Sequence, residues 1–336
     1  MINVLYIGNK LNHKQTNTTS IDILGPLLES EGFKLYYAST VHNKFFRLLD
    51  MVFKTIRYAY KIDVVLIDTY STQNFYYAFA VSQVCKLLNL KYIPILRGGN
   101  LERRLKFSPR LCQAIFTKAK VMVAPSVYIR DLFQRFDYLD VVYVPNSIPI
   151  QQYRFQPKTV DTVKLLWVRA FSTIYNPQLA VSLLKVLRED GLDASLCMVG
   201  PDSDGSFKKV EQLVNDLQVP VRLTGKLSKT EWTNLATDYN VFVNTTNFDN
   251  MPVSVIEAMA LGLPIVSTNV GGMPYLIDDG KDGLLVPPND AKAMANAIKR
   301  IMNNPETTKT MTFNARKKAE RFAWEVVKHQ WFEVLR

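Results

Sequence analysis

Two carboxylates, Asp249 and Glu257, stand eight positions apart in the part of the chain with the densest turn and helix signals. A carboxylate accepts hydrogen bonds and repels anions, so the pair suits a ligand that offers hydroxyl groups, such as a ribose or a sugar ring. Asp249 falls in the polar loop NTTNFDN, which follows an apolar strand. Glu257 falls about one turn into the helix that comes next. We therefore expect both side chains at one ligand site.

The helix after this loop begins with signals that favour anion binding at its first turn. Asn250 is predicted to be the N-cap, and Pro252 is tolerated in the first turn because no amide donor is needed there. The first turn of a helix carries N–H groups without intrahelical acceptors and the positive end of the helix dipole. The expected donor-binding residues of this segment are Asn250, Met251, Pro252, Val253 and the hydroxyl of Ser254.

A second helix start is predicted after the glycine pair Gly271-Gly272, at Met273 and Pro274. It follows a short apolar strand at 264–268, just as the first helix start follows a strand. Two helix N-termini at strand ends would offer free amides and two positive dipole ends. We expect such an arrangement to bind a diphosphate.

The order of these residues resembles the donor-binding signature of retaining glycosyltransferases of family 4, which have the GT-B fold. The family shows a Glu, seven residues, a second Glu, then Ala-Met-Ala, a Gly-hydrophobic-Pro step and a Gly-Gly pair. The matching residues here are Asp249, Glu257, Ala258-Met259-Ala260, Gly262-Leu263-Pro264 and Gly271-Gly272. Asp249 stands where the family has its first Glu, which is a departure from the pattern. The shorter side chain of Asp is expected to shift the contact with the sugar. The resemblance covers most of the chain and is strong from about residue 240 to 290.

The resemblance implies an α/β fold of the GT-B type. It has two doubly wound Rossmann-like domains facing a central cleft, with a C-terminal helix that crosses back to the first domain. A length of 336 residues also favours two domains. The run VPNSI at 144–148 resembles the family's domain boundary, and a polar stretch with two prolines follows. We expect an acceptor-side domain at 1–155, a nucleotide-sugar-binding domain at 156–318 and the returning helix at 319–336.

The second domain opens with the strand VKLLWVRAF, and Arg169 lies near its end. The resemblance assigns Arg169 to the donor diphosphate, and a guanidinium fork suits phosphate oxygens. The family's Lys about five residues later is missing, because residues 174–176 are Ile, Tyr and Asn. The implied catalytic set is Arg169, Asp249 and Glu257, with the ribose on Glu257 and the sugar hydroxyls near Asp249. Backbone contacts to the base are implied for Gly225, Lys226 and Leu227.

Acceptor contacts are expected in loops of the first domain. His13 and Lys14 lie in the loop after the first strand, which faces the cleft in GT-B enzymes, although a solvated polar loop is an equal alternative. Arg97 and Asn100 follow another strand at the position where many relatives place a His. A tight structural turn is an equally good interpretation there.

Composition limits the other functional classes. Hydrophobic residues make up 48% of the chain and charged residues 21%, as in an ordinary soluble globular protein. No window approaches the roughly 18 apolar residues of a membrane span, and the N-terminal run shows no signal pattern. The three cysteines lie far apart in apolar surroundings and show no paired spacing. We therefore expect them to be buried free thiols, as in proteins of a reducing cytosol. No metal site is expected, because the Asp202-x-Asp204 pair is interpreted as a turn, and no cofactor is expected.

The formal net charge of +11 points to an anionic partner. Nucleic acid ranks low, because no recognition module is present. The basic amphipathic stretch at 43–61 favours a packed helix with a solvated basic face. The alternative is a helix that lies on an anionic membrane surface.

The sequence thus predicts a retaining glycosyltransferase that moves a sugar from a UDP- or GDP-sugar to a glycan or lipid-linked acceptor. The resemblance suggests bacterial surface polysaccharide assembly, in the cytoplasm or peripherally on the inner face of the plasma membrane. The main alternative is a non-catalytic GT-B subunit that only binds the sugar nucleotide. A third hypothesis is an epimerase or phosphorylase on the same fold.

Overall fold

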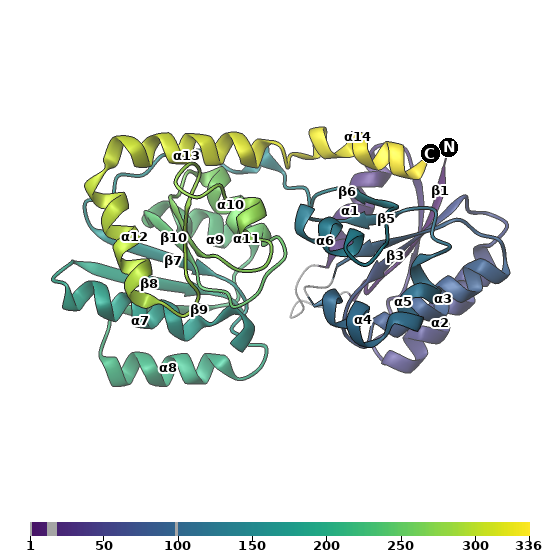
Figure 1. Ribbon diagram of the computed structural model, residues 1–336, viewed down its shortest axis with the longest axis horizontal. Coiled ribbons are helices and arrows are strands. Elements are labelled where there is room, and N and C mark those ends of the chain that lie inside the picture. Colours follow the sequence, from purple (N-terminus) through teal and green to yellow (C-terminus); the bar gives the residue numbers. More distant parts are fainter. Residues whose placement is uncertain (1, 12–18, 98–99) are drawn as a thin grey trace. The chain divides into compact units, whose positions relative to one another are not determined.

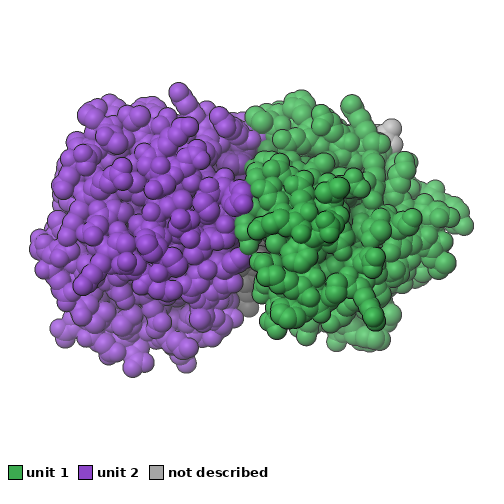
Figure 2. All heavy atoms as spheres, in the orientation of Figure 1, with its two compact units in different colours: residues 1–146, 324–336 green, residues 147–323 purple. Residues whose placement is uncertain are grey.

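The computed structural model describes residues 2–11, 19–97 and 100–336. The chain divides into two compact units, coloured separately in Figure 2. Unit 1 comprises residues 1–146 and 324–336, and unit 2 comprises residues 147–323. The predicted acceptor contacts His13 and Lys14 lie outside the described residues.

Unit 1 is built on a six-stranded parallel sheet with the order β2-β1-β3-β4-β5-β6. Its central strands β3 and β4 are buried along their whole length, as expected where helices cover both faces of a sheet. The strands are β1 Asn3–Ile7, β2 Lys34–Ala38, β3 Val64–Thr69, β4 Tyr92–Leu96, β5 Met122–Ala124 and β6 Val141–Tyr143. The helices are α1 Ser20–Ser30, α2 Lys44–Tyr58, α3 Phe75–Leu87, α4 Leu101–Phe107, α5 Pro109–Phe116, α6 Val127–Gln134 and α14 Trp324–Leu335.

Unit 2 is built on a second six-stranded parallel sheet, ordered β12-β11-β10-β7-β8-β9. The strands are β7 Val163–Val168, β8 Ala194–Val199, β9 Val221–Gly225, β10 Val241–Asn244, β11 Ile265–Thr268 and β12 Leu284–Val286. The helices are α7 Pro177–Glu189, α8 Ser206–Leu217, α9 Lys229–Leu235, α10 Val253–Leu261, α11 Met273–Leu276, α12 Ala291–Asn303 and α13 Pro305–Glu320. Short 3₁₀ turns occur at η1 Ile150–Gln152, η2 Thr173–Tyr175 and η3 Ala236–Asp238.

The strand order of unit 2 reverses between β7 and β10, which are hydrogen-bonded neighbours. From β7 the chain continues outward to β8 and β9, and from β10 it continues the opposite way to β11 and β12. The connections that leave the carboxyl ends of β7 and β10 therefore run in opposite directions, and such a point is where open α/β sheets bind ligands. Topology alone thus directs attention to the residues that follow these two strands.

The C-terminal helix α14 belongs to unit 1 (Figure 1). Trp324 and Trp331 are buried in a cluster with residues of β1, and the indole N–H of Trp324 donates to Glu31 at 3.0 Å. Burial of two large aromatic side chains is a strong reason for the chain to return to this unit. The expected return of the terminal helix is confirmed.

The unit boundaries lie at 146/147 and 323/324, whereas the boundaries expected from the sequence are 155/156 and 318/319. Ile148, Ile150 and Tyr153 are buried in the core of unit 2 with residues of α10, so the segment before 156 belongs to that unit. The same core holds Phe322 and Ala323, which follow α13. None of the helices within the described ranges has the length and apolar character needed to cross a bilayer.

Candidate functional site

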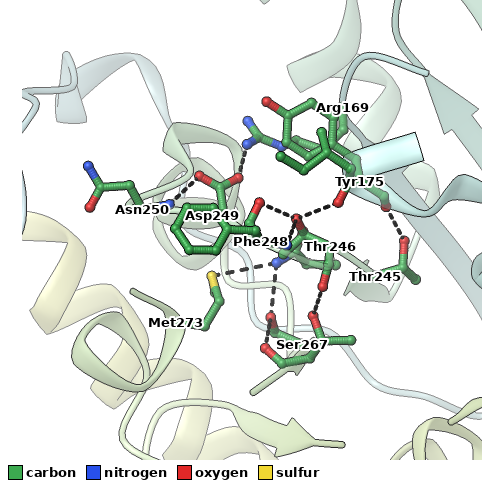
Figure 3. A network of polar contacts seen from close by, with 12 residues as sticks. Arg169, Tyr175, Thr245, Thr246, Phe248, Asp249, Asn250, Ser267 and Met273 are labelled. Atoms are coloured by element: carbon green, nitrogen blue, oxygen red, sulfur yellow. Dashed lines mark hydrogen bonds and ion pairs between the residues drawn. The ribbon is translucent and has the colours of Figure 1, made fainter. Parts of the chain in front are cut away.

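Arg169 and Asp249 meet at the point where the strand order of unit 2 reverses (Figure 3). Arg169 follows β7, Asp249 lies in the loop after β10, and their side chains form an ion pair. The guanidinium of Arg169 also stacks on the ring of Tyr175, 4.1 Å from its centroid. Burial lowers the pKa of Arg169 from its usual value, while Tyr175 opposes the shift. The Nε of Arg169 is buried and has no hydrogen-bond partner among the described residues, so it can donate to a ligand.

The polar residues that follow β10 hold the Asp249 loop in place (Figure 3). The indole N–H of Trp167 donates to Thr245 at 2.9 Å, and Thr245 in turn donates to the carbonyl of Tyr175. The hydroxyl of Thr246 donates to the carbonyl of Phe248 at 2.8 Å. Buried hydroxyls need such partners, and here the partners fix the course of the loop. The residues Asn244, Thr245 and Thr246 therefore hold the backbone of the Asp249 loop in position.

The glycine pair Gly271-Gly272 packs directly against the Asp249 loop. The amide of Gly272 donates to the carbonyl of Asp249 at 2.8 Å. A Cβ on Gly272 would lie 1.7 Å from the carbonyl oxygen of Asn250, and one on Gly271 would lie 2.3 Å from that of Asp249. Only glycine permits this approach, because any side chain would push the two loops apart.

This packing corrects the prediction of free amides at the second helix start. The amide of Gly272 is used by Asp249, and the amide of Met273 donates to the carbonyl of Val270 at 3.0 Å. The helix itself, α11, has only four residues. The second helix start therefore positions the Asp249 loop, and the amides of Gly272 and Met273 are engaged within the protein.

The start of α10 differs from the prediction by two residues. Pro252, and not Asn250, occupies the N-cap, with an extended backbone at φ −68° and ψ 118°. The amide of Asn250 instead donates to the Oδ1 atom of Asp249 at 2.7 Å. The amides of Val253 and Ser254 lie in the first helical turn, which has no intrahelical acceptors for them. The hydroxyl oxygen of Ser254 is buried and has no hydrogen-bond partner among the described residues.

Glu257 is buried on α10 and is held by two residues that the sequence pattern does not predict. Its Oε1 atom accepts a hydrogen bond from the hydroxyl of Tyr153 at 2.7 Å and forms an ion pair with Lys229. Burial first, and then the negative charge of Glu257, raises the pKa of Tyr153, which keeps its hydroxyl protonated as a donor. Both of these contacts are made by Oε1, and neither of them engages Oε2.

No local pattern signals Tyr153 or Lys229, since they lie 104 and 28 residues from Glu257. Lys229 begins α9, and its side chain is 52% exposed, so its ammonium group stays at the surface of the site. The predicted base-side residues Gly225, Lys226 and Leu227 lead from β9 into α9. They share the carboxyl edge of the parallel sheet with Arg169.

The Asp202-x-Asp204 pair forms the predicted turn. Asp202 accepts hydrogen bonds from the amides of Gly205 and Phe207, and Asp204 accepts from Ser206 and Thr173. These hydrogen bonds lower the pKa of Asp204. Both carboxylates thus act as local caps before α8.

Arg97 in unit 1 is engaged within the protein. Its Nε atom lies 3.3 Å from Asp68, and its guanidinium donates to Asn146 at 2.5 Å. The hydroxyl of Tyr6 also donates to Asp68, and burial raises the pKa of this carboxyl group while Arg97 opposes the shift. The network favours the structural interpretation of Arg97 over an acceptor contact.

Asn100 lines a cavity of about 550 Å³ in unit 1, at the carboxyl end of β4. The other lining residues are Ser71, Thr72, Arg103, Arg104, Phe107 and Ser108. Arg104 is held by a hydrogen bond to the carbonyl of Ser71 at 2.8 Å and by the ring of Phe75. Arg103 is exposed. The cavity therefore presents hydroxyl groups and positive charge.

Comparison with solved structures identifies the fold as GT-B. Sucrose-phosphate synthase from Thermosynechococcus elongatus superposes with a TM-score of 0.81 at 19% identity, over 99% of this chain and 98% of that one. HepE from Anabaena, solved in complex with UDP and glucose, superposes with a TM-score of 0.79 at 17% identity, over 100% of this chain and 99% of that one. The expected fold class is confirmed.

The chain belongs to the family described as glycosyl transferases group 1, whose model matches residues 150–318. The sulfoquinovosyl transferase SQD2 of Arabidopsis thaliana is 28% identical over 149 residues, 43% of this chain and 28% of that protein. The putative colanic acid biosynthesis glycosyltransferase WcaL of Salmonella typhimurium is 36% identical over 91 residues, 26% of this chain and 22% of that protein. The matching segments thus span less than a third of either relative.

Proposed function

We propose that this protein transfers a sugar from a UDP- or GDP-sugar to a hydroxyl group of a glycan or lipid-linked acceptor, with retention of the anomeric configuration. The observation that carries the proposal is the set of Arg169, Asp249 and Glu257 around the strand-order reversal of unit 2. It lies within the segment that matches the family. Each of these side chains has a free or exchangeable polar atom for a different part of a nucleotide-sugar.

The donor would bind to unit 2 in three parts. Its ribose hydroxyl donates to the Oε2 atom of Glu257, in the manner of a hydroxyl on a buried carboxylate. Its diphosphate accepts hydrogen bonds from Arg169 and from the first turn of α10, where the amides of Val253 and Ser254 and the Ser254 hydroxyl meet the positive end of the helix dipole. Its sugar hydroxyls donate to Asp249. When the diphosphate binds Arg169, Asp249 gives up its ion pair with Arg169 and accepts hydrogen bonds from the sugar instead.

Transfer follows from this arrangement without a dedicated protein base. The bond between the anomeric carbon and the diphosphate oxygen breaks, the acceptor oxygen bonds to the same face of that carbon, and its proton passes to the departing diphosphate. Arg169 and the α10 terminus stabilise the negative charge that develops on the diphosphate. Asp249 and Glu257 position the sugar and the nucleoside. The protein's contribution is electrostatic stabilisation and orientation.

The acceptor is assigned to unit 1, where the cavity at Asn100 and Arg103 suits an anionic group such as a phosphate of a lipid-linked acceptor. The name of one relative, a putative colanic acid biosynthesis glycosyltransferase, supports a role in polysaccharide assembly, and we propose the cytoplasmic face of the membrane as its place. Neither a metal ion nor an organic cofactor takes part in the proposed reaction.

The test is transfer from labelled UDP- and GDP-sugars to a detergent extract of bacterial membranes, with the anomeric configuration of the product determined by NMR. We expect product from one donor series, with the donor's configuration retained, and about a hundredfold less product with Asp249→Asn. Donor binding without transfer to any extract would favour the non-catalytic binding subunit. Conversion of the donor to an isomeric nucleotide-sugar without an acceptor would favour an epimerase.

A further inference from the structure

Helix α2 of unit 1 turns a continuous apolar face toward solvent. We name this face the outer arc of α2. Its residues are between 47% and 102% exposed, and they are Phe45, Phe46, Leu49, Phe53, Ile56 and, just after the helix, Tyr60. At about 100° per residue, these positions fall within about 100° of one another around the helix axis. Such a concentration of exposed aromatic and aliphatic side chains on a single helix indicates an interaction surface.

The opposite side of α2 is the one that packs on unit 1. Arg47, Met51 and Thr55, spaced by four residues, are buried. The guanidinium of Arg47 donates to the carbonyls of Val41 and His42, each at 2.7 Å. These contacts fix the rotation of the helix about its axis.

The rotation of α2 corrects part of the favoured sequence interpretation, because Lys44, Arg57 and Lys61 are solvated as expected but the apolar surface is not packed. Arg47, one of the cations of that pattern, turns inward, and phenylalanines turn outward. Figure 1 shows α2 beside α3, with which it packs. Within unit 1, the outer arc itself is left to solvent.

A basic strip borders one side of the outer arc. Arg57 and Lys61 are exposed and make no ion pair within the described residues. The acidic residue of α2, Asp50, is paired with Lys54 at 3.0 Å. The helix therefore combines an apolar arc with uncompensated positive charge at its edge, which is the pattern of helices that lie in the plane of a membrane interface.

We propose that α2 docks this protein on an anionic lipid bilayer. The helix lies flat, the outer arc enters the boundary between headgroups and acyl chains, and Arg57 and Lys61 contact lipid phosphates. At 15 residues α2 is about 22 Å long, which suits a helix in the membrane plane. This proposal does not depend on the proposed sugar transfer.

Charge distinguishes this occupant from a second copy of the chain. A twofold dimer through α2 would place the same surface on both sides of the interface. Depending on the crossing of the helices, the strips with Arg57 and Lys61 would come close to one another and repel. Anionic lipid headgroups instead supply the opposite charge, at about a fivefold gain in affinity per cation.

The test is sedimentation of the full chain with phosphatidylcholine vesicles, with and without phosphatidylglycerol. We expect binding that requires the anionic lipid and weakens with salt. Phe46→Ser/Phe53→Ser should reduce the partition coefficient at least about tenfold, and Arg57→Glu/Lys61→Glu should abolish the preference for anionic vesicles. The four positions are exposed, so each variant should keep the wild-type melting temperature and nucleotide affinity.

Matched controls change exposed apolar residues and exposed basic residues elsewhere. Leu87→Ser/Leu139→Ser removes two apolar side chains that are 82% and 75% exposed, and Lys208→Glu/Lys209→Glu reverses two charges on α8. Both controls should bind vesicles like the wild type. A Phe53→Trp probe should show a blue-shifted emission with anionic vesicles and quenching by brominated lipid.

Three results would overturn the proposal. The first is that the wild type fails to bind anionic vesicles. The second is that the outer-arc variants bind as well as the wild type does. The third is light scattering that shows a dimer of the wild type, converted to a monomer by Phe46→Ser/Phe53→Ser without any vesicle binding, since the arc would then bind a second copy.

Discussion

Arg169 and Asp249 form an ion pair that links the carboxyl ends of β7 and β10, at the point where the sheet of unit 2 reverses its strand order. The pair is largely buried, with 19% and 12% of the two side chains exposed. Without a ligand, Asp249 neutralises the cation that a donor diphosphate would need. Donor binding must therefore exchange one partner of Arg169 for another, and the two residues should respond differently to mutation.

Asp249→Asn should separate binding from transfer. The amide removes the negative charge that competes for Arg169, so the affinity for UDP or GDP should stay equal or rise. Transfer should fall by about two orders of magnitude, because the sugar loses a charged acceptor that orients it. Calorimetry and initial-rate kinetics measure the two effects. Arg169→Lys is the matched comparison and should weaken nucleotide binding about tenfold, since an ammonium group replaces the guanidinium fork. Parallel loss of binding in Asp249→Asn would contradict this role.

Lys229→Ala should show which part of the nucleotide depends on this cation. We expect the variant to bind UDP several-fold more weakly while its affinity for uridine changes little, because Lys229 is the exposed cation nearest Glu257 and can reach a phosphate. Calorimetric titrations with both ligands provide the comparison. An equal loss for uridine and UDP would mean that Lys229 only holds Glu257 in place. Lys185→Ala, at an exposed lysine of α7, is the control.

Gly272→Ala should displace the Asp249 loop, although Gly272 itself makes no proposed contact with the donor. The added methyl group would meet the carbonyl of Asn250, so the Asp249 loop must shift. We expect destabilisation on the order of 1–3 kcal/mol, together with weaker nucleotide binding. Gly191→Ala is the control, because Gly191 has a φ of +81° but open space around its Cβ position. It should cost about 1 kcal/mol and leave nucleotide affinity unchanged. Wild-type affinity in a folded Gly272→Ala variant would show that the glycine pair does not position Asp249.

The buried thiols should make the protein less stable in alkali. Burial raises the pKa of Cys85 to about 12 and that of Cys112 to about 11, from an ordinary value of 9.0. Between the ordinary thiol pKa of 9.0 and the raised pKa of each folded-state thiol, the unfolded chain binds fewer protons than the folded chain. The free energy of unfolding therefore falls as the pH rises through this range. The contribution is fully present below about pH 9 and declines by up to about 1.4 kcal/mol per pH unit for each thiol.

Urea unfolding at a series of pH values checks this effect. Cys85→Ala should be less stable than the wild type at neutral pH because it leaves a small cavity. The difference between the two proteins should then narrow above pH 9, where the wild type loses the contribution of the thiol. A constant difference across this range would contradict the raised pKa.

Much of the site was predictable because its residues are close together in the chain. Asp249, Glu257 and the glycine pair lie on one βαβ unit, where turn and helix signals constrain the backbone locally. Arg169 was predictable because the resemblance places an Arg at the end of the apolar strand that opens the second domain. The two parallel sheets and the returning helix with its tryptophans also followed from sequence pattern and resemblance.

The rest depends on contacts between distant segments. Tyr153 and Lys229 reach Glu257 from elements far away in sequence, and no periodicity reports such pairs. The glycine pair was recognised, but its packing against Asp249 depends on how two loops meet in space. The rotation of α2 was predicted wrongly, because its cations were counted without the contacts that draw Arg47 inward.

The measurement that tests the central claim most directly is calorimetric binding of UDP and GDP to the wild type and to Glu257→Gln, with and without a chelator. The account predicts that one nucleotide binds, that the chelator changes nothing, and that the variant binds about 10- to 100-fold more weakly because a charged hydrogen-bond acceptor is lost. Glu189→Gln, at an exposed residue of α7, should bind like the wild type. Equal binding by wild type and Glu257→Gln, or no binding of either nucleotide to the wild type, would contradict the donor site in unit 2.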